Sequence, residues 1–267
     1  MNSRFTSFSK ILLQFVIAIT LSSIGPGLVF AAIINIHSIK DNTLYEFVPA
    51  DGDRSNALGE HFFAGETGIG ELRRGVLAFD IAGNIPAGSI VTSVTLSLNM
   101  SRTPLDTPRT VELHTLLADW CEGTSDAPDE EGQGAPATLS DVTWRHRFYD
   151  TIFWATQGGD FSGTVSASQS VGGVGLYTWS SLQMVADVQL WLNDSATNFG
   201  WLVLGDESEI ATSKRFDTRE STNPPVLTIE YNPAIKASTP RGVTPFCAHP
   251  APTPRPRPTS LPRPTPH

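Results

Sequence analysis

The sequence predicts an all-β domain, an antiparallel β-sandwich of the jelly-roll type with one short helix capping it. Three observations predict this class. Short runs of alternating apolar and polar residues follow one another from residue 33 to residue 232, separated by Gly, Asn, Asp and Pro. Only one segment has the apolar spacing of an amphipathic helix. No internal repeat is visible, and these 200 residues are enough for one sandwich with a substantial core.

The clearest strand pattern lies at 90–100. Val94, Leu96 and Leu98 alternate there with threonine and serine, as in a strand with one face in a core and the other in solvent. Similar alternation, or a short apolar run between turn residues, predicts further strands at 61–65, 73–81, 110–117, 199–204 and 226–231. Counting such runs gives about eight to ten strands.

The segment 73–81 is predicted to be a central strand, because its odd positions from 77 to 81 are large and apolar. Arg74 and Asp80 fall on the opposite face, where a partly buried charge is costly unless it is paired. Arg219 and Glu220, just ahead of the closing strand, are the candidate partners. We therefore expect these four residues to form a structural charge network.

The one predicted helix lies at 180–194 and ends at an Asn-Asp pair. Its apolar residues recur at spacings of three to four: Leu182, Val185, Val188 and Leu192. We expect it to cap the sandwich. Residues 121–137 are acidic and rich in Gly and Pro, which indicates a long loop.

Both ends of the chain differ in composition from the predicted domain. Residues 1–32 run from basic positions through an apolar stretch to Gly-Pro-Gly and two alanines, the order of a secretory signal peptide. A retained membrane anchor is the alternative, because the apolar stretch is long for a signal. Residues 233–267 are rich in proline, which predicts an extended, disordered tail. We expect a secreted or cell-surface domain at 33–232, with no membrane span after signal removal.

Charge is divided unevenly between the domain and the tail. All 27 acidic residues lie at 33–232 together with 11 Lys and Arg, so this domain carries 11 − 27 = −16 with histidine neutral. Such acidity argues against nucleic acid as a partner, because phosphate binding depends on Lys and Arg. The tail has five basic residues and no acid, which either contact an anionic surface or only keep the tail soluble.

The chain has two cysteines, Cys121 in the predicted loop and Cys247 in the tail. In an exported protein they could pair and hold the start of the tail against the domain. Two unrelated thiols are the alternative, and the sequence leaves both open.

The hexapeptide Asp41-Asn42-Thr43-Leu44-Tyr45-Glu46 resembles the one that names the DNRLRE family, also described as carbohydrate-binding module family 96, and departs from it at Thr43 and Tyr45. Further matches follow in the family's order: Arg73-Arg74 with Phe79-Asp80, Ile85-Pro86-Ala87-Gly88, Trp120 with Glu122-Gly123, Gly158-Gly159-Asp160-Phe161, Trp191, Asn198-Phe199-Gly200, Phe216-Asp217-Thr218-Arg219-Glu220 and Pro224-Pro225-Val226-Leu227. The resemblance covers residues 33–231. It implies a secreted jelly-roll module and, as in some members, binding of acidic polysaccharides such as alginate.

The sequence contains none of the common nucleophile, zinc or phosphate-loop motifs. Two acidic segments could offer oxygens to Ca²⁺: Asp126, Asp129, Glu130 and Glu131, and Asp206, Glu207 and Glu209. Neither has the spacing of a known calcium loop, so solvated surface acids are the alternative. We expect no catalytic metal and no cofactor, with structural Ca²⁺ left open.

Aromatic and basic side chains gather at 142–154, the candidate sugar-binding segment. Sugar rings stack their C–H faces on aromatic rings, and arginine pairs with uronate carboxylates. The candidate binding residues are Trp144, Arg145, Arg147, Tyr149 and Trp154. Burial in the core is the alternative for both tryptophans, and it is the expectation for the four other tryptophans.

Three hypotheses for function follow. The first is a secreted, non-catalytic module that binds an extracellular polysaccharide, and the charge of the domain favours a neutral glycan unless the arginines act locally or Ca²⁺ bridges a polyuronate. The second is a structural or adhesive protein of the cell surface, associated with the cell envelope and displayed on its proline-rich spacer. The third is a polysaccharide lyase, although no acid and base can be named for it.

Overall fold

The computed structural model describes residues 31–234, and all structural statements below concern that range. Almost all of the predicted signal peptide and tail, and with them Cys247, lie outside it. Cys121 is buried. None of the helices in the described range has the length and hydropathy needed to cross a bilayer.

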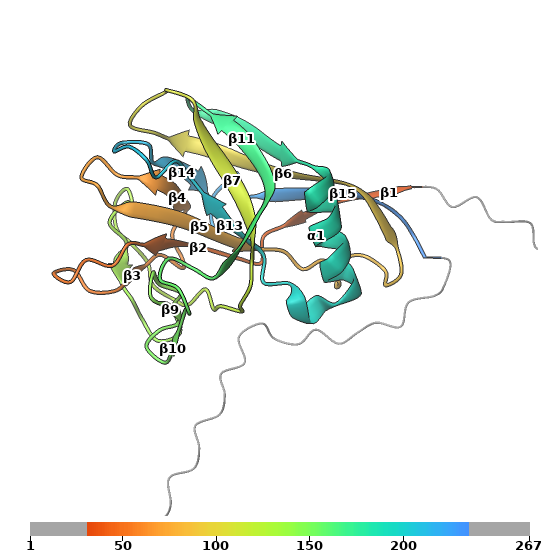
Figure 1. Cartoon of the computed structure of the whole chain (residues 1–267), viewed down its shortest axis with the longest axis horizontal. Coiled ribbons are helices and arrows are strands. Elements are labelled where there is room, and N and C mark those ends of the chain that lie inside the picture. Colours follow the sequence, from red (N-terminus) through yellow and green to blue (C-terminus); the bar gives the residue numbers. More distant parts are fainter. Residues whose placement is uncertain (1–30, 235–267) are drawn as a thin grey trace, which may run out of the picture.

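The predicted all-β sandwich is confirmed: one antiparallel sheet curls into two facing layers (Figure 1). The first layer consists of β1 (Ala32–His37), β15 (Val226–Asn232), β6 (Ile90–Arg102), β12 (Gly175–Ser180) and β14 (Lys214–Asp217). The second layer consists of β2 (Lys40–Tyr45), β5 (Leu72–Ala78), β13 (Trp201–Leu204), β7 (Arg109–Leu116) and β11 (Phe161–Val171). At the outer edge of the first layer, β1 and β15 pair so that Ala32 lies opposite Tyr231.

The strand β4 (His61–Glu66) joins the two layers. Its first four residues pair with β14, whereas Gly65 and Glu66 pair with β5. Gly65 has φ +114°, a conformation that side chains disfavour, and a Cβ there would lie 3.0 Å from the Cα of Ser213. The sheet therefore turns its corner at a position that requires glycine.

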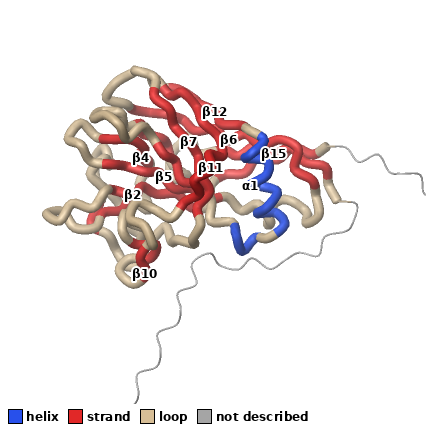
Figure 2. The backbone as a smooth tube through the Cα atoms, in the orientation of Figure 1, coloured by secondary structure: helices blue, strands red, loops and turns tan. Residues whose placement is uncertain are grey.

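The main core lies between the layers and beneath the helix α1 (Leu182–Asn193). The prediction of this helix is confirmed: the Ser181 hydroxyl accepts a hydrogen bond from the Met184 amide at 2.9 Å and caps its first turn. Figure 2 shows α1 lying across the direction of the strands, and it packs against β6 and β11. The ring of Trp191 meets that of Trp201 edge-on, with the two ring centres 4.6 Å apart. A short 3-10 helix, η1 (Ser195–Thr197), follows α1.

A second, smaller core covers the other face of the β2, β5, β13 and β7 layer. It consists of Leu44, Val76, Ala78, Leu116, Trp120, Val142, Trp144, Trp154 and Leu202. The cover is the segment 118–160, whose regular structure is limited to β8 (Ala135–Pro136), which pairs with β3 (Arg54–Ser55), and to the pair β9 (His146–Phe148) and β10 (Ile152–Phe153). The predicted long loop at 121–137 is thus confirmed. The covered part of this layer is therefore buried on both faces, and every residue of β2 is buried, whereas Thr110 in β7 stays exposed and Glu112 half-buried.

Several strand predictions need correction. The central strand ends at Ala78, and Asp80 instead opens a turn in which its carboxylate accepts from the Gly83 amide at 2.8 Å. Five strands of the large sheet had no predicted counterpart, β1, β2, β11, β12 and β14, and neither had the short strands β3, β8, β9 and β10. Of these, β11 is rich in Ser, Gly and Thr and shifts register twice against β7, which breaks its period of two.

Candidate functional site

The prediction that Trp144 and Trp154 stack on sugar rings is wrong. Their side chains are buried, with 7% and 5% of their surface exposed, because both belong to the second core. The Trp154 indole donates to the Thr143 carbonyl at 3.0 Å, and the Arg74 guanidinium lies 4.8 Å from the ring centre of Trp144. Both tryptophans anchor the cover segment and offer no open ring face to a ligand. The other four tryptophans are buried as expected.

The arginines of the same segment are held by the protein itself. Arg145 forms a bidentate pair with Asp53, and its guanidinium lies 3.6 Å from the ring centre of Phe47. Because Asp53 already takes the place of a ligand carboxylate, the expected role of Arg145 toward a uronate is not supported. Arg147 is half-buried and donates to the Asp119 carbonyl at 2.8 Å.

Two aromatic side chains of this segment do reach the surface. Tyr149 is half-buried and meets the ring of His146 edge-on at 5.1 Å. Phe153 in β10 is 59% exposed, and its ring lies 4.2 Å from that of His146. Of the predicted sugar-binding residues, Tyr149 and Arg147 remain partly accessible at this hairpin.

The predicted charge network divides into two clusters. Arg219 does pair with Glu220, at 2.9 Å, and it also binds both carboxylate oxygens of Glu122. Arg74 instead forms two hydrogen bonds with Glu207, at 2.7 and 2.8 Å, and Asp80 takes no part. Leu204 lies opposite Arg74 where β13 pairs with β5, and this places the residues that follow β13 beside the arginine.

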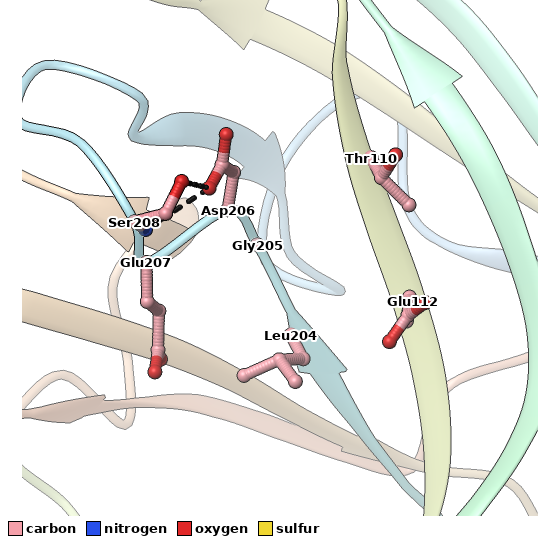
Figure 3. Close-up of a pocket in the computed structure, with 7 residues that line it drawn as sticks. All are labelled: Thr110, Glu112, Leu204, Gly205, Asp206, Glu207 and Ser208. Carbon is pink, nitrogen blue, oxygen red and sulfur yellow. Dashed lines mark hydrogen bonds between the residues drawn. The ribbon is translucent and has the colours of Figure 1, made fainter.

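A groove of about 450 Å³ lies on the second layer at the edge of the second core. It is lined by Thr110, Glu112, Leu204, Gly205, Asp206, Glu207 and Ser208 (Figure 3). The first two residues come from β7, Leu204 ends β13, and the rest follow it directly. Leu204 packs against the second core and lies between Glu112 and Glu207 in Figure 3.

The carboxylates of the groove are fixed in position. Arg74 holds Glu207, and Arg109 donates to Asp206 at 3.0 Å. Hydrogen bonds from the hydroxyl and amide of Ser208, together with Arg109, lower the pKa of Asp206, so this group is ionised at neutral pH. Glu112 lies 3.3 Å from the imidazole of His114. The groove thus offers ordered hydrogen-bond acceptors around an apolar floor.

Several carboxylates of the two acidic segments considered for Ca²⁺ are already bound by other groups of the protein. Glu130 pairs with Arg102 and Arg215, and Glu209 pairs with Arg109. Glu131 accepts from the backbone amides of Glu60 and His61 and from the Asn56 amide. Neither segment brings three carboxylates together in the described part of the chain.

The only such group within residues 31–234 consists of Asp41, Glu122 and Glu220. The sequence prediction missed it, because its members come from three distant segments. A signal was nevertheless present: each residue belongs to one of the motifs quoted for the family resemblance, at 41–46, 120–123 and 216–220.

Comparison of the chain with models of known protein families and with curated protein sequences finds no match. The resemblance to the DNRLRE family therefore stays a prediction that rests on the motifs quoted for it.

Proposed function

We propose that this domain is a secreted, non-catalytic module that binds an extracellular polysaccharide, and that its site is the groove beside β7 and β13. The observation that carries the proposal is the lining of the groove: fixed carboxylates surround Leu204 on an open sheet face. Sugar hydroxyls donate to such acceptors, and the apolar side of a sugar ring packs on an aliphatic floor.

Charge selects the class of polysaccharide. Glu112, Asp206 and Glu207 line the groove, and Glu209 lies beside it. Within residues 31–234, the arginines paired with these four acids are Arg74 and Arg109. An excess of negative charge repels a polyuronate and does not oppose a neutral glycan. The proposed ligand is therefore a neutral polysaccharide, in place of the acidic one that the family resemblance implies.

Affinity gel electrophoresis of the full chain tests this function. Gels containing neutral polysaccharides such as β-glucan or xylan should retard the protein, and alginate gels should not. Glu112→Gln keeps the shape of the side chain but removes an acceptor that no arginine holds, so we expect at least about a tenfold loss of affinity, the effect of one lost hydrogen bond to a charged group. Glu60→Gln, at an exposed glutamate outside the groove, is the matched control.

The outcomes separate the hypotheses. Retardation that is equal for wild type and Glu112→Gln would place binding outside the groove. No retardation in any gel would remove the binding function and favour the structural or adhesive hypothesis. Release of unsaturated uronate products from alginate would replace binding by the lyase hypothesis.

A further inference from the structure

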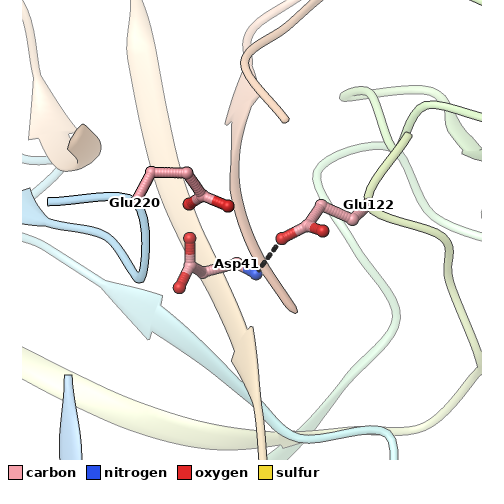
Figure 4. Close-up of side chains that lie close together, drawn as sticks. All are labelled: Asp41, Glu122 and Glu220. Carbon is pink, nitrogen blue, oxygen red and sulfur yellow. Dashed lines mark hydrogen bonds between the residues drawn. The ribbon is translucent and has the colours of Figure 1, made fainter. Parts of the chain in front are cut away.

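Three carboxylates from separate segments converge beside β2. Asp41 belongs to β2, Glu122 follows Trp120 in the cover segment, and Glu220 follows β14. One oxygen of each lies within 4.8 Å of the others, and Figure 4 shows the three side chains directed toward one another. The Asp41 amide donates to Glu122 at 2.8 Å, which fixes the distance between their two segments.

Two oxygens of this cluster lack a donor among the described residues. Asp41 is fully buried, and its Oδ2 accepts from the Ser38 hydroxyl at 2.7 Å and from the Arg219 amide at 3.1 Å. Its Oδ1 is buried without a hydrogen bond, and so is Oε2 of Glu220. A buried carboxylate oxygen that has lost its hydration and has no donor is energetically costly. These two oxygens therefore indicate a ligand that accepts their lone pairs.

The cluster is also short of positive charge. The Arg219 guanidinium is the cation within it, through bonds of 2.9 and 2.6 Å to Glu122 and one of 2.9 Å to Glu220. Lys40, next to Asp41 in sequence, directs its ammonium to Asp119 and to the Trp120 carbonyl. Three carboxylates against one guanidinium leave two negative charges, the amount that one divalent cation balances.

We propose that Asp41, Glu122 and Glu220 form a binding site for a hard divalent cation, Ca²⁺ by preference. Ligands that are all carboxylate oxygens suit such a cation and not a soft metal. Oxygens on opposite sides of Ca²⁺ stand about 4.6–5.2 Å apart, and those around Mg²⁺ stand only about 4.0–4.2 Å apart. The three oxygens lie within 4.8 Å of one another, close enough to contact one ion of the size of Ca²⁺.

The electrostatics of Asp41 support the site. Burial, together with the negative charges of Glu122 and Glu220 and against the hydrogen bond from Ser38, raises the pKa of Asp41 to about 8. Burial also raises the pKa of Glu122 and Glu220. The alternative occupant of the site is thus a proton on Asp41. A bound cation stabilises all three ionised carboxylates and joins β2, the cover segment and the turn after β14.

Removal and return of calcium test the proposal on the full chain. Protein dialysed against EDTA should bind Ca²⁺ in isothermal titration calorimetry, and its thermal unfolding midpoint should rise with added Ca²⁺. Mg²⁺ at the same concentration should have a smaller effect. Glu220→Gln should weaken Ca²⁺ binding by about tenfold or more, because it removes one of three charged ligands. Asp126→Asn, at an exposed acid outside the cluster, should bind as wild type does.

The absence of binding heat and of any shift in the midpoint for wild type would overturn the proposal and leave a proton as the occupant. An equal calcium effect in wild type and Glu220→Gln would also overturn it, since the ion would then lie elsewhere. Asp41→Asn is a second probe that should abolish the effect. If that variant fails to fold, Glu220→Gln still decides, because Glu220 is only partly buried and the pair of Arg219 with Glu122 remains.

Discussion

Lys214 in β14 is a buried cation held by oxygen atoms. Its side chain is 1% exposed, and its ammonium donates to Thr103 Oγ1 and to the carbonyls of Leu105, Thr107 and Gly172, at 2.9–3.3 Å. Burial lowers the pKa of Lys214. The four oxygen acceptors replace the water that the charged ammonium group loses on burial. One lysine thereby holds the loop after β6 against the end of β11.

Replacing this lysine should destabilise the fold. Lys214→Met keeps the length of the side chain but leaves buried carbonyls without a donor, so we expect a loss of about 2 kcal/mol in the free energy of unfolding, measured in urea. Arg102→Met serves as the control, because Arg102 is more than half exposed and its pair with Glu130 is worth about 1 kcal/mol at most. Similar losses in both variants would contradict a buried role for Lys214.

His146 should make stability depend on pH. The ring is 3% exposed and lies between Thr143, at 3.1 Å, and Asp53, at 3.5 Å, with the rings of Tyr149 and Phe153 against it. Burial lowers the pKa of His146; Asp53 and Asp150 oppose that shift and Arg145 adds to it. Below the usual pKa of about 6.5 the unfolded chain takes up a proton that the folded protein resists. The contribution of His146 to the free energy of unfolding is therefore complete above about pH 6.5 and is lost as the pH falls below that value.

Urea unfolding at pH 7.5 and pH 5.5 checks this dependence. Wild type should lose more stability over this interval than His146→Gln, which has no proton to take up. His37→Gln, at an exposed histidine of β1, should lose as much as wild type. Equal losses for wild type and His146→Gln would show that another group carries the pH dependence.

At the scale of elements, the corner in β4 is a position where the backbone conformation requires glycine. Gly65→Ala would place a methyl group 3.0 Å from the Thr212 carbonyl oxygen as well as in a disfavoured φ region, so we expect a loss of about 1–3 kcal/mol. Gly68→Ala, where a new Cβ meets nothing within 4 Å, is the matched control and should change stability little. Thermal unfolding of both variants compares them, and equal stability would mean that the corner tolerates a side chain.

The elements that the sequence predicted well are those with one buried and one exposed face. The strand β6 alternates from Ser93 to Ser101, and α1 repeats its apolar residues every three to four positions. The strand β2 gave no signal, because four of its six residues, 40–43, are polar and are buried through hydrogen bonds, so no apolar alternation marks it. The strand β11 gave none because its side chains are small and its register shifts.

At the scale of the whole molecule, the fold class could be predicted from the sequence, but the ion-pair partners of the charged side chains could not. Arg74 and Glu207 are 133 positions apart, and only the order of β5 and β13 in the sheet brings them together. The burial of Trp144 and Trp154 likewise depends on a second core that no local sequence pattern predicts. The groove and the carboxylate cluster both arise from segments that topology alone makes adjacent, so periodicity does not predict them.

The pairing of β1 with β15 has a mechanical consequence. The strands are antiparallel, and Ala32 lies opposite Tyr231, so the chain enters and leaves the domain at the same end of one ladder. A pulling force between these two points acts along the hydrogen bonds and across the strands, and it loads the bonds one after another. Tension carried through the chain ends would therefore peel β1 from the edge before the sandwich resists as a whole.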